Sequence, residues 1–272
     1  MGGLCPRPAA PPGIFSDRKC SRQAGLPPTG RAAILDGTLK GGVFVKIGIL
    51  TTGHAPDALR PEHGDYPDLF ARLLAGQGFS FESWAVVDMQ FPPGPGAADG
   101  WLITGSRHGA YERHAFIPPL EALIRAIYAA GVPLVGICFG HQIIAQALGG
   151  KVEKYTGGWA VGRTEYDFGG ERIALNAWHQ DQVTQVPANA RVVASNACCA
   201  NAALVYDDRI FSVQAHPEFN RDWIGDMIEK RGRGIVPDPL LDAAKARVDQ
   251  PIDDARLAAR IGAFFRSRDI AA

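Results

Sequence analysis

Residues 135–150 read VGICFGHQIIAQALGG and place one cysteine between a strand-like run and a segment of helical period. The apolar residues before Cys138 predict a buried strand, and Ile143, Ile144 and Leu148 recur on one face of a helix. Cys138 therefore lies at a sharp turn from strand to helix, between two glycines that permit close backbone approach. In open α/β sheets, such turns lie at the carboxyl edge where ligands bind.

This position favours a reactive thiol, because the N-terminus of the following helix stabilises the thiolate. The backbone N–H of Phe139 is also placed to face an oxyanion. The alternative is that Cys138 is a small buried hydrophobic residue, as many free cysteines are. A base elsewhere in the chain decides between the two.

The segment FSVQAHPEF, residues 211–219, offers that base. An apolar strand ends near His216, Pro217 interrupts the hydrogen-bond ladder, and Glu218 follows. In extended chain, residues 216 and 218 point to the same side, so the carboxylate can orient the imidazole. Thiol, base and acid form the arrangement of a catalytic triad. The alternative for His216 is a hydrogen-bonded structural histidine.

The composition indicates a soluble globular protein: 272 residues, 46% hydrophobic and 21% charged. Twenty-eight basic and 28 acidic residues cancel, which argues against nucleic acid or a membrane surface as partner and favours a small-molecule substrate. We expect a cytoplasmic protein because no membrane span or signal peptide is evident. The five cysteines show no zinc or disulfide spacing.

We expect no metal and no cofactor. Five histidines, in particular, lack ligand spacing with a carboxylate or cysteine: His54, His63, His108, His114 and His141.

Strand-like and amphipathic segments alternate from Val45, which predicts an α/β domain with a mostly parallel sheet. Residues 1–44 are rich in proline and glycine, so we expect them to be disordered or to lie upstream of the true start. One domain should span residues 45–272, with a core at 45–225 and C-terminal helices at 226–272.

Helices are expected near residues 65–77 and 116–130. After residue 150, short strand-like runs such as ERIALNAWH predict an antiparallel extension of the sheet. The last helix should bury one apolar face, formed by Leu257, Ile261, Phe264 and Phe265.

With GICFGHQ and AHPEF in this order, the chain resembles the class I glutamine amidotransferases. The segments GWLITGS, GGWAVGRTEY and WHQDQV add to the resemblance, which covers roughly residues 45–225. It implies a three-layer, flavodoxin-like α/β fold. It also implies a reaction in which the cysteine attacks the side-chain amide of glutamine, releases ammonia and leaves a γ-glutamyl thioester for water to hydrolyse.

The resemblance assigns roles residue by residue. Cys138 is the nucleophile, His216 the general base and then acid, and Glu218 the orienting carboxylate. The oxyanion donors and substrate contacts that it implies are the backbone of Gly105 and Phe139, the side chain of Gln142, and the backbone near Trp159 and Ala160.

The oxyanion strand continues as TGSRHGAY, where many synthase-linked members have Gly-Gly-Pro. This variant resembles the stand-alone branch that includes the plant γ-glutamyl peptidases, so the alternative substrate is a γ-glutamyl peptide. Ammonia released from glutamine would go to a separate synthase subunit or to solvent. An alternative of another class is a non-catalytic regulatory or binding subunit.

Overall fold

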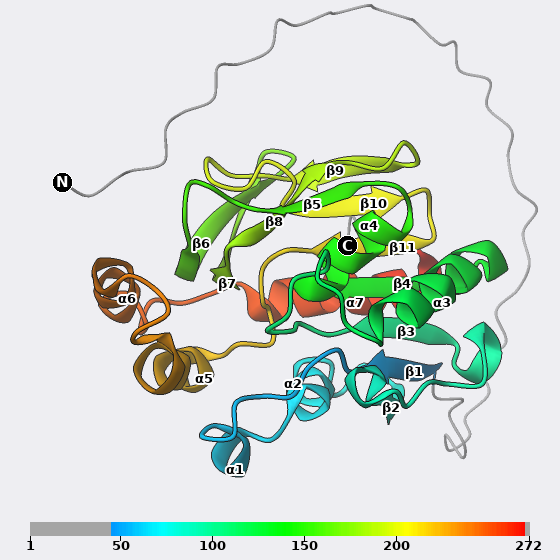
Figure 1. Cartoon of the computed structure of the whole chain (residues 1–272), viewed down its shortest axis with the longest axis horizontal. Helices are drawn as coiled ribbons and strands as arrows, with labels where there is room; N and C mark the ends of the chain where they lie inside the picture. The colour runs from blue at the N-terminus through cyan, green and yellow to red at the C-terminus, as the bar shows by residue number, and fades with distance from the viewer. Residues whose placement is uncertain (1–44, 270–272) are drawn as a thin grey trace, which may run out of the picture.

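The computed structural model describes residues 45–269, and a seven-stranded sheet runs through its centre (Figure 1). Neighbouring strands are parallel from β2 through β1, β3 and β4 to β11, whereas β10 is antiparallel to both β11 and β9. In sheet order, the strands are β2 (Phe79–Trp84), β1 (Val45–Leu50), β3 (Gly100–Ile103), β4 (Leu134–Ile137), β11 (Ile210–Val213), β10 (Ala203–Tyr206) and β9 (Ala190–Ala194). The predicted parallel sheet with an antiparallel extension is confirmed. The expectations for residues 1–44 lie outside the described residues.

Helices cover both faces of this sheet, because its parallel strands are apolar on both sides. Alternate strand residues divide between the faces: Ile49 packs with the α7 side, whereas Leu50 packs with α3 and α4. The helices are α1 (Arg60–His63), α2 (Tyr66–Leu73), α3 (Ile117–Ala130), α4 (Phe139–Ala147), α5 (Arg221–Asp226), α6 (Asp238–Lys245) and α7 (Asp254–Ser267). Short turns of other helix types are η1 (Val86–Asp88), η2 (Pro95–Ala97) and η3 (Met227–Gly232).

The predicted apolar face of the last helix is confirmed. In α7, Leu257, Ile261, Phe264 and Phe265 are all buried in the cluster that covers one face of the sheet. The helices predicted near residues 65–77 and 116–130 correspond to α2 and α3. Within residues 45–269, no helix combines the length and apolarity needed to cross a bilayer.

The strand predicted at residues 171–179 forms, but not as part of the central sheet. This strand, β7 (Glu171–His179), pairs along its whole length with β6 (Ala160–Phe168) in a separate two-stranded sheet. Its nine-residue partner precedes it directly, and the joining Gly169 and Gly170 adopt the positive φ that a tight hairpin turn needs. A second small sheet pairs β5 (Lys151–Lys154) with β8 (Asp181–Gln185).

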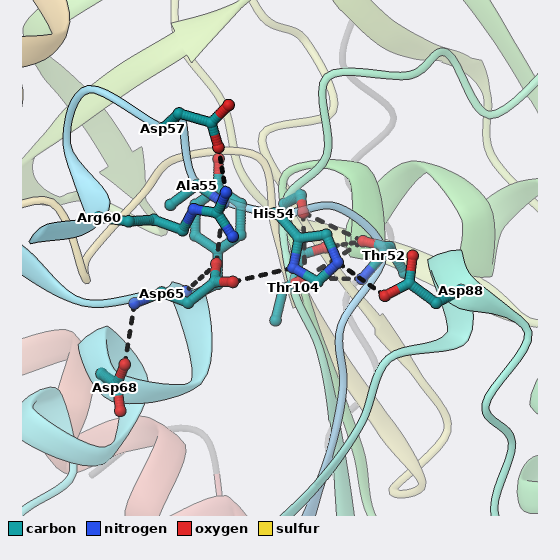
Figure 2. A network of polar contacts seen from close by, with 11 residues as sticks. Thr52, His54, Ala55, Asp57, Arg60, Asp65, Asp68, Asp88 and Thr104 are labelled. Carbon is teal, nitrogen blue, oxygen red and sulfur yellow. Dashed lines mark hydrogen bonds and ion pairs between the residues drawn. The ribbon is translucent and has the colours of Figure 1, made fainter.

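Hydrogen bonds of two threonines connect the loops that follow the carboxyl ends of β1 and β3. The Thr52 hydroxyl contacts the carbonyl oxygens of Thr104 and Gly105 at 3.0 and 3.1 Å. The backbone N–H of Thr52 donates to Thr104 Oγ1. Figure 2 shows this contact beside a second network around His54. Both loops are therefore held at the sheet edge where the segments after β4 and β11 also emerge.

Candidate active site

Cys138 forms the turn between β4 and α4, which we call the elbow, in a backbone conformation that is rare for residues other than glycine. Its φ of 53° and ψ of −102° are held by the backbone N–H, which donates to Val213 O at 2.9 Å. The glycines around it are required: a Cβ on Gly140 would collide with Ile103 O, and one on Gly136 would lie 2.6 Å from Gly140 C. Such imposed strain is characteristic of functional turns.

His216 and Glu218 form a buried pair beyond the end of β11. His216 Nδ1 lies 2.6 Å from Glu218 Oε1, and the two side chains are 4% and 0% exposed. The other carboxylate oxygen, Oε2, makes no hydrogen bond with any residue in the described part of the chain. Because an ionised carboxylate only accepts hydrogen bonds, the contact fixes the proton of the neutral ring on Nδ1 and leaves Nε2 as the basic nitrogen.

Contacts from β7 and from an aromatic ring hold this pair in place. The backbone carbonyl of Asn176 accepts the backbone N–H of His216 at 2.8 Å, and the Asn176 side-chain amide donates to Phe219 O at 2.8 Å. The Phe219 ring stacks on the imidazole, with centroids 3.9 Å apart and an interplanar angle of 5°. The imidazole therefore has little freedom to rotate.

The charges around His216 favour its protonated form. Burial opposes protonation, but the charges of Glu218 and Cys138 and the hydrogen bonds to both outweigh it and raise the pKa of His216 above its ordinary value. His216 Cε1 and Cys138 Cβ lie 2.9 and 3.8 Å from the position that a Cβ on Gly105 would take, so the imidazole is close to the thiol. By contrast, burial lowers the pKa of His179 to about 4, and the nearby charge of His216 acts in the same direction. A positive charge on His216 therefore disfavours protonation of His179.

Gln214 is a site residue that sequence reasoning missed. It is fully buried, and its Nε2 approaches Cys138 Sγ at 3.7 Å. Its Oε1 accepts a hydrogen bond from Gln142 Nε2 at 3.1 Å. The alternation that relates residues 216 and 218 also places residue 214 on the same side, so this signal was present in the sequence.

Gln142, expected to contact the substrate, has partners inside the protein. It is buried, and besides Gln214 its Nε2 donates to Asp181 O at 2.9 Å. Gln142 thereby connects the elbow helix α4 to β8 and, through Gln214, to the Cys138 thiol. A direct contact with substrate stays a prediction.

The expected oxyanion segment lies against both Cys138 and His216. A Cβ built on Gly105 would be 2.9 Å from His216 Cε1 and 3.8 Å from Cys138 Cβ. On the other side of the elbow, Phe139 is the first residue of α4, and N–H groups at that helix position have no partner within the helix. Gly105 and Phe139 thus lie close to Cys138, and their role as oxyanion donors stays a prediction.

Trp159 and Ala160 lie at the start of the β6–β7 hairpin. Ala160 is the register partner of His179, the neighbour of His216, and both Trp159 and Ala160 are partly exposed. Trp159 packs edge-on against Trp178, with ring centroids 6.5 Å apart. The segment therefore borders the site, but its binding role stays a prediction.

The same site carries the pattern of a known family. A family model described as "Glutamine amidotransferase class-I" matches residues 90–231, which include the elbow and the His216–Glu218 pair. γ-Glutamyl peptidase 4 of Arabidopsis thaliana is 29% identical over 76% of this chain and 89% of its own length. The glutamine-hydrolysing GMP synthase of Clostridium novyi is 35% identical over 46% of this chain and 25% of its own length.

A solved structure supports the same assignment at the level of the fold. The glutamine amidotransferase of Methylobacillus flagellatus superimposes with a TM-score of 0.64 and 22% identity, over 83% of this chain and 94% of that one. The predicted flavodoxin-like α/β architecture is confirmed. The chain thus belongs to the class I glutamine amidotransferase family.

Proposed function

We propose that this protein is a cysteine hydrolase that cleaves γ-glutamyl amide bonds through a thioester on Cys138. One observation carries the proposal: a strained, glycine-flanked cysteine faces a buried imidazole whose other nitrogen lies 2.6 Å from a carboxylate. Burial excludes water from the pair, so the charge on the carboxylate acts on the imidazole with little screening. The elevated pKa of His216 supports an imidazolium that can donate a proton to the leaving nitrogen.

The chemistry then proceeds in two steps. The Cys138 thiolate attacks the γ-carbonyl carbon, and the oxyanion that forms is stabilised by the backbone N–H groups of Gly105 and Phe139. His216 donates its proton to the leaving nitrogen, the C–N bond breaks, and a γ-glutamyl thioester and an amine remain. His216 then takes a proton from water, whose oxygen attacks the thioester. The C–S bond breaks, glutamate leaves, and the Cys138 thiolate and protonated His216 are restored for the next turnover. Glu218 orients the imidazole and stabilises its positive charge in both steps.

Two leaving groups fit this reaction. Family membership supports glutamine, which would release ammonia. The relatives support a γ-glutamyl peptide, which would release an amino acid or peptide amine. This chain covers 89% of the length of γ-glutamyl peptidase 4 but 25% of that of the GMP synthase. With glutamine as substrate, a separate synthase subunit is the partner that would receive ammonia.

A substrate panel distinguishes the two reactions. We expect the purified full chain to release glutamate from γ-glutamyl compounds, with ammonia measured for glutamine and free amine measured for γ-glutamyl dipeptides. A higher kcat/KM for dipeptides assigns the peptidase reaction, and a higher value for glutamine assigns the glutaminase reaction. Turnover of neither would contradict the proposal.

A covalent probe tests the nucleophile separately. A glutamine-like electrophile should label wild-type protein at one site and leave Cys138→Ala unlabelled, whereas Cys199→Ala, which removes another buried free thiol, should label normally. Labelling that persists in Cys138→Ala would remove Cys138 from the mechanism. If the wild type is neither labelled nor active, the non-catalytic subunit becomes the better interpretation.

A further inference from the structure

Two histidines and a glutamate converge in the loop between β3 and α3, outside the thiol site. His108, Glu112 and His114 each offer one ligand atom, and these atoms lie within 4.8 Å of one another. Glu112 Oε2 is at the centre, 2.7 Å from His114 Nε2 and 3.8 Å from His108 Nδ1. The side chains of the histidines are 19% and 33% exposed and that of the glutamate 46%, so the cluster is open to solvent on one side.

These distances match the spacing of ligands around a small metal ion. Four ligands at about 2.0–2.1 Å from tetrahedral Zn²⁺ lie about 3.3 Å apart from one another. The two distances to Glu112 Oε2, 2.7 and 3.8 Å, fall on either side of that spacing. Two imidazoles and one carboxylate are also a ligand set used by zinc sites that keep a water in the fourth position. Small side-chain rotations would therefore complete the coordination.

Among the residues that the structure describes, no lysine or arginine forms an ion pair with this cluster. Glu112 has only histidines as ion-pair partners there. A second group with metal-ligand chemistry, Glu62, His63 and Asp226, differs in this respect. Lys230 Nζ lies 2.8 Å from Asp226 and 3.6 Å from Glu62, so an ammonium group already neutralises that cluster. The comparison favours the His108 cluster as the one that needs an added cation.

The surrounding loop holds the histidines in place. The backbone N–H of His108 donates to Ser106 Oγ at 3.2 Å, and Ser106 Oγ donates to Thr52 O at 2.7 Å. The buried ring of Phe116 packs against both imidazoles, with centroids 5.9 Å from His108 and 5.8 Å from His114. Contacts of this kind orient ligands before the ion arrives and raise affinity.

We propose that His108, Glu112 and His114 bind one divalent transition-metal ion, with Zn²⁺ as the best fit to the two imidazoles and one carboxylate. The proposal departs from the sequence-based expectation of no metal, which rested on the lack of ligand spacing between these histidines and a carboxylate or cysteine. The site is separate from Cys138, but His108 lies in the loop that begins at Gly105. The bound ion therefore restricts the conformation of the loop that follows the expected oxyanion segment.

Metal titration of the full chain tests this proposal without relying on activity. Isothermal titration calorimetry with Zn²⁺ should show one equivalent bound by wild type, and His108→Ala and His114→Ala should each weaken affinity at least about 10-fold. Co²⁺ in place of Zn²⁺ should give visible absorption bands of a four- or five-coordinate ion without the intense charge-transfer bands of a thiolate ligand. That spectrum excludes binding at the cysteines.

Two controls sharpen the test. His63→Ala alters the Lys230-neutralised cluster and should leave Zn²⁺ affinity unchanged. Glu112→Gln keeps the size of the side chain but removes its charge, so it should weaken Zn²⁺ binding. This result holds even if an alanine variant folds poorly. Circular dichroism of the ion-free variants checks that each one is folded. Failure of wild type to bind Zn²⁺, a thiolate-type cobalt spectrum, or unchanged affinity in Glu112→Gln and both alanine variants would each overturn the proposal.

Discussion

Two histidines follow strands of the central sheet and contact carboxylates at similar distances, yet their surroundings differ. His216 Nδ1 lies 2.6 Å from Glu218, and both side chains are almost fully buried. His54 Nδ1 and Nε2 lie 2.9 and 2.8 Å from Asp65 and Asp88, but the His54 side chain is 38% exposed (Figure 2).

In the proposed mechanism, burial and a ring nitrogen without a carboxylate partner separate the reactive histidine, His216, from the structural histidine, His54. Both ring nitrogens of His54 face carboxylates, so both donate when the ring is protonated and neither is left to act as a base. His216 uses only Nδ1 for its carboxylate and directs the rest of the ring toward Cys138 and Gly105. His54 instead connects the loop after β1 to the start of α2 and to η1.

The largest expected effect tests the difference between His216 and His54 directly. His216→Asn should lower kcat/KM for γ-glutamyl substrates by roughly 10³-fold or more, because the thiol loses its base and the leaving group its acid. The matched variant His54→Asn should leave kcat/KM close to wild type. Steady-state kinetics on both variants makes the measurement, and similar losses in the two would erase the proposed distinction.

A smaller loss is expected when the carboxylate is neutralised. Glu218→Gln preserves the shape of the side chain but removes the charge that stabilises the imidazolium, so kcat should fall roughly 10²–10⁴-fold, as for other triad carboxylates. Thiol titration should still find Cys138 present. Unchanged kcat would mean that Glu218 has no part in turnover.

Gly105→Ala should disturb His216 by crowding alone. The added methyl group would lie 2.9 Å from His216 Cε1, and displacement of a catalytic group by about 1 Å costs up to about 10²-fold in rate. Gly96→Ala is the control, since no atom lies within 4 Å of the position that its added methyl group would take. Kinetics on the pair checks this expectation, and equal rates in both would show that the contact near His216 is not critical.

The smallest effect concerns stability and pH at His54. The hydrogen bond to Asp65, opposed by partial burial and assisted by that to Asp88, raises the pKa of His54 above its ordinary value of 6.5. Its contribution to stability is thus fully present below pH 6.5 and is lost as the pH rises through the elevated folded-state pKa. Solvent screening of this exposed network limits the effect to about 1 kcal/mol or less.

Urea unfolding of wild type and His54→Asn at about pH 6 and at about pH 9 measures this dependence. The wild type should exceed the variant in free energy of unfolding at the lower pH, and the gap should narrow at the higher pH. A gap that widens with pH would contradict the sign of the linkage.

The main elements of the sheet were predictable because their signals are local. An apolar run between turn residues identified β7 with its observed bounds, and the spacing of apolar residues identified the buried face of α7. The partner of β7 was not predictable from its own pattern. The residue pattern of an apolar strand is the same whether the strand joins a central sheet or a separate hairpin, and only packing decides between the two.

For the candidate site, the sequence by itself determined the chemistry that each motif can supply. A cysteine at a strand-to-helix turn and an alternating His-Pro-Glu segment are arrangements of neighbouring residues, fixed by backbone geometry. Tertiary structure alone decided which distant residues meet: Gln214 at the Cys138 thiol and Asn176 at the backbone of His216. Those contacts depend on how separate segments pack, and no local pattern encodes that packing.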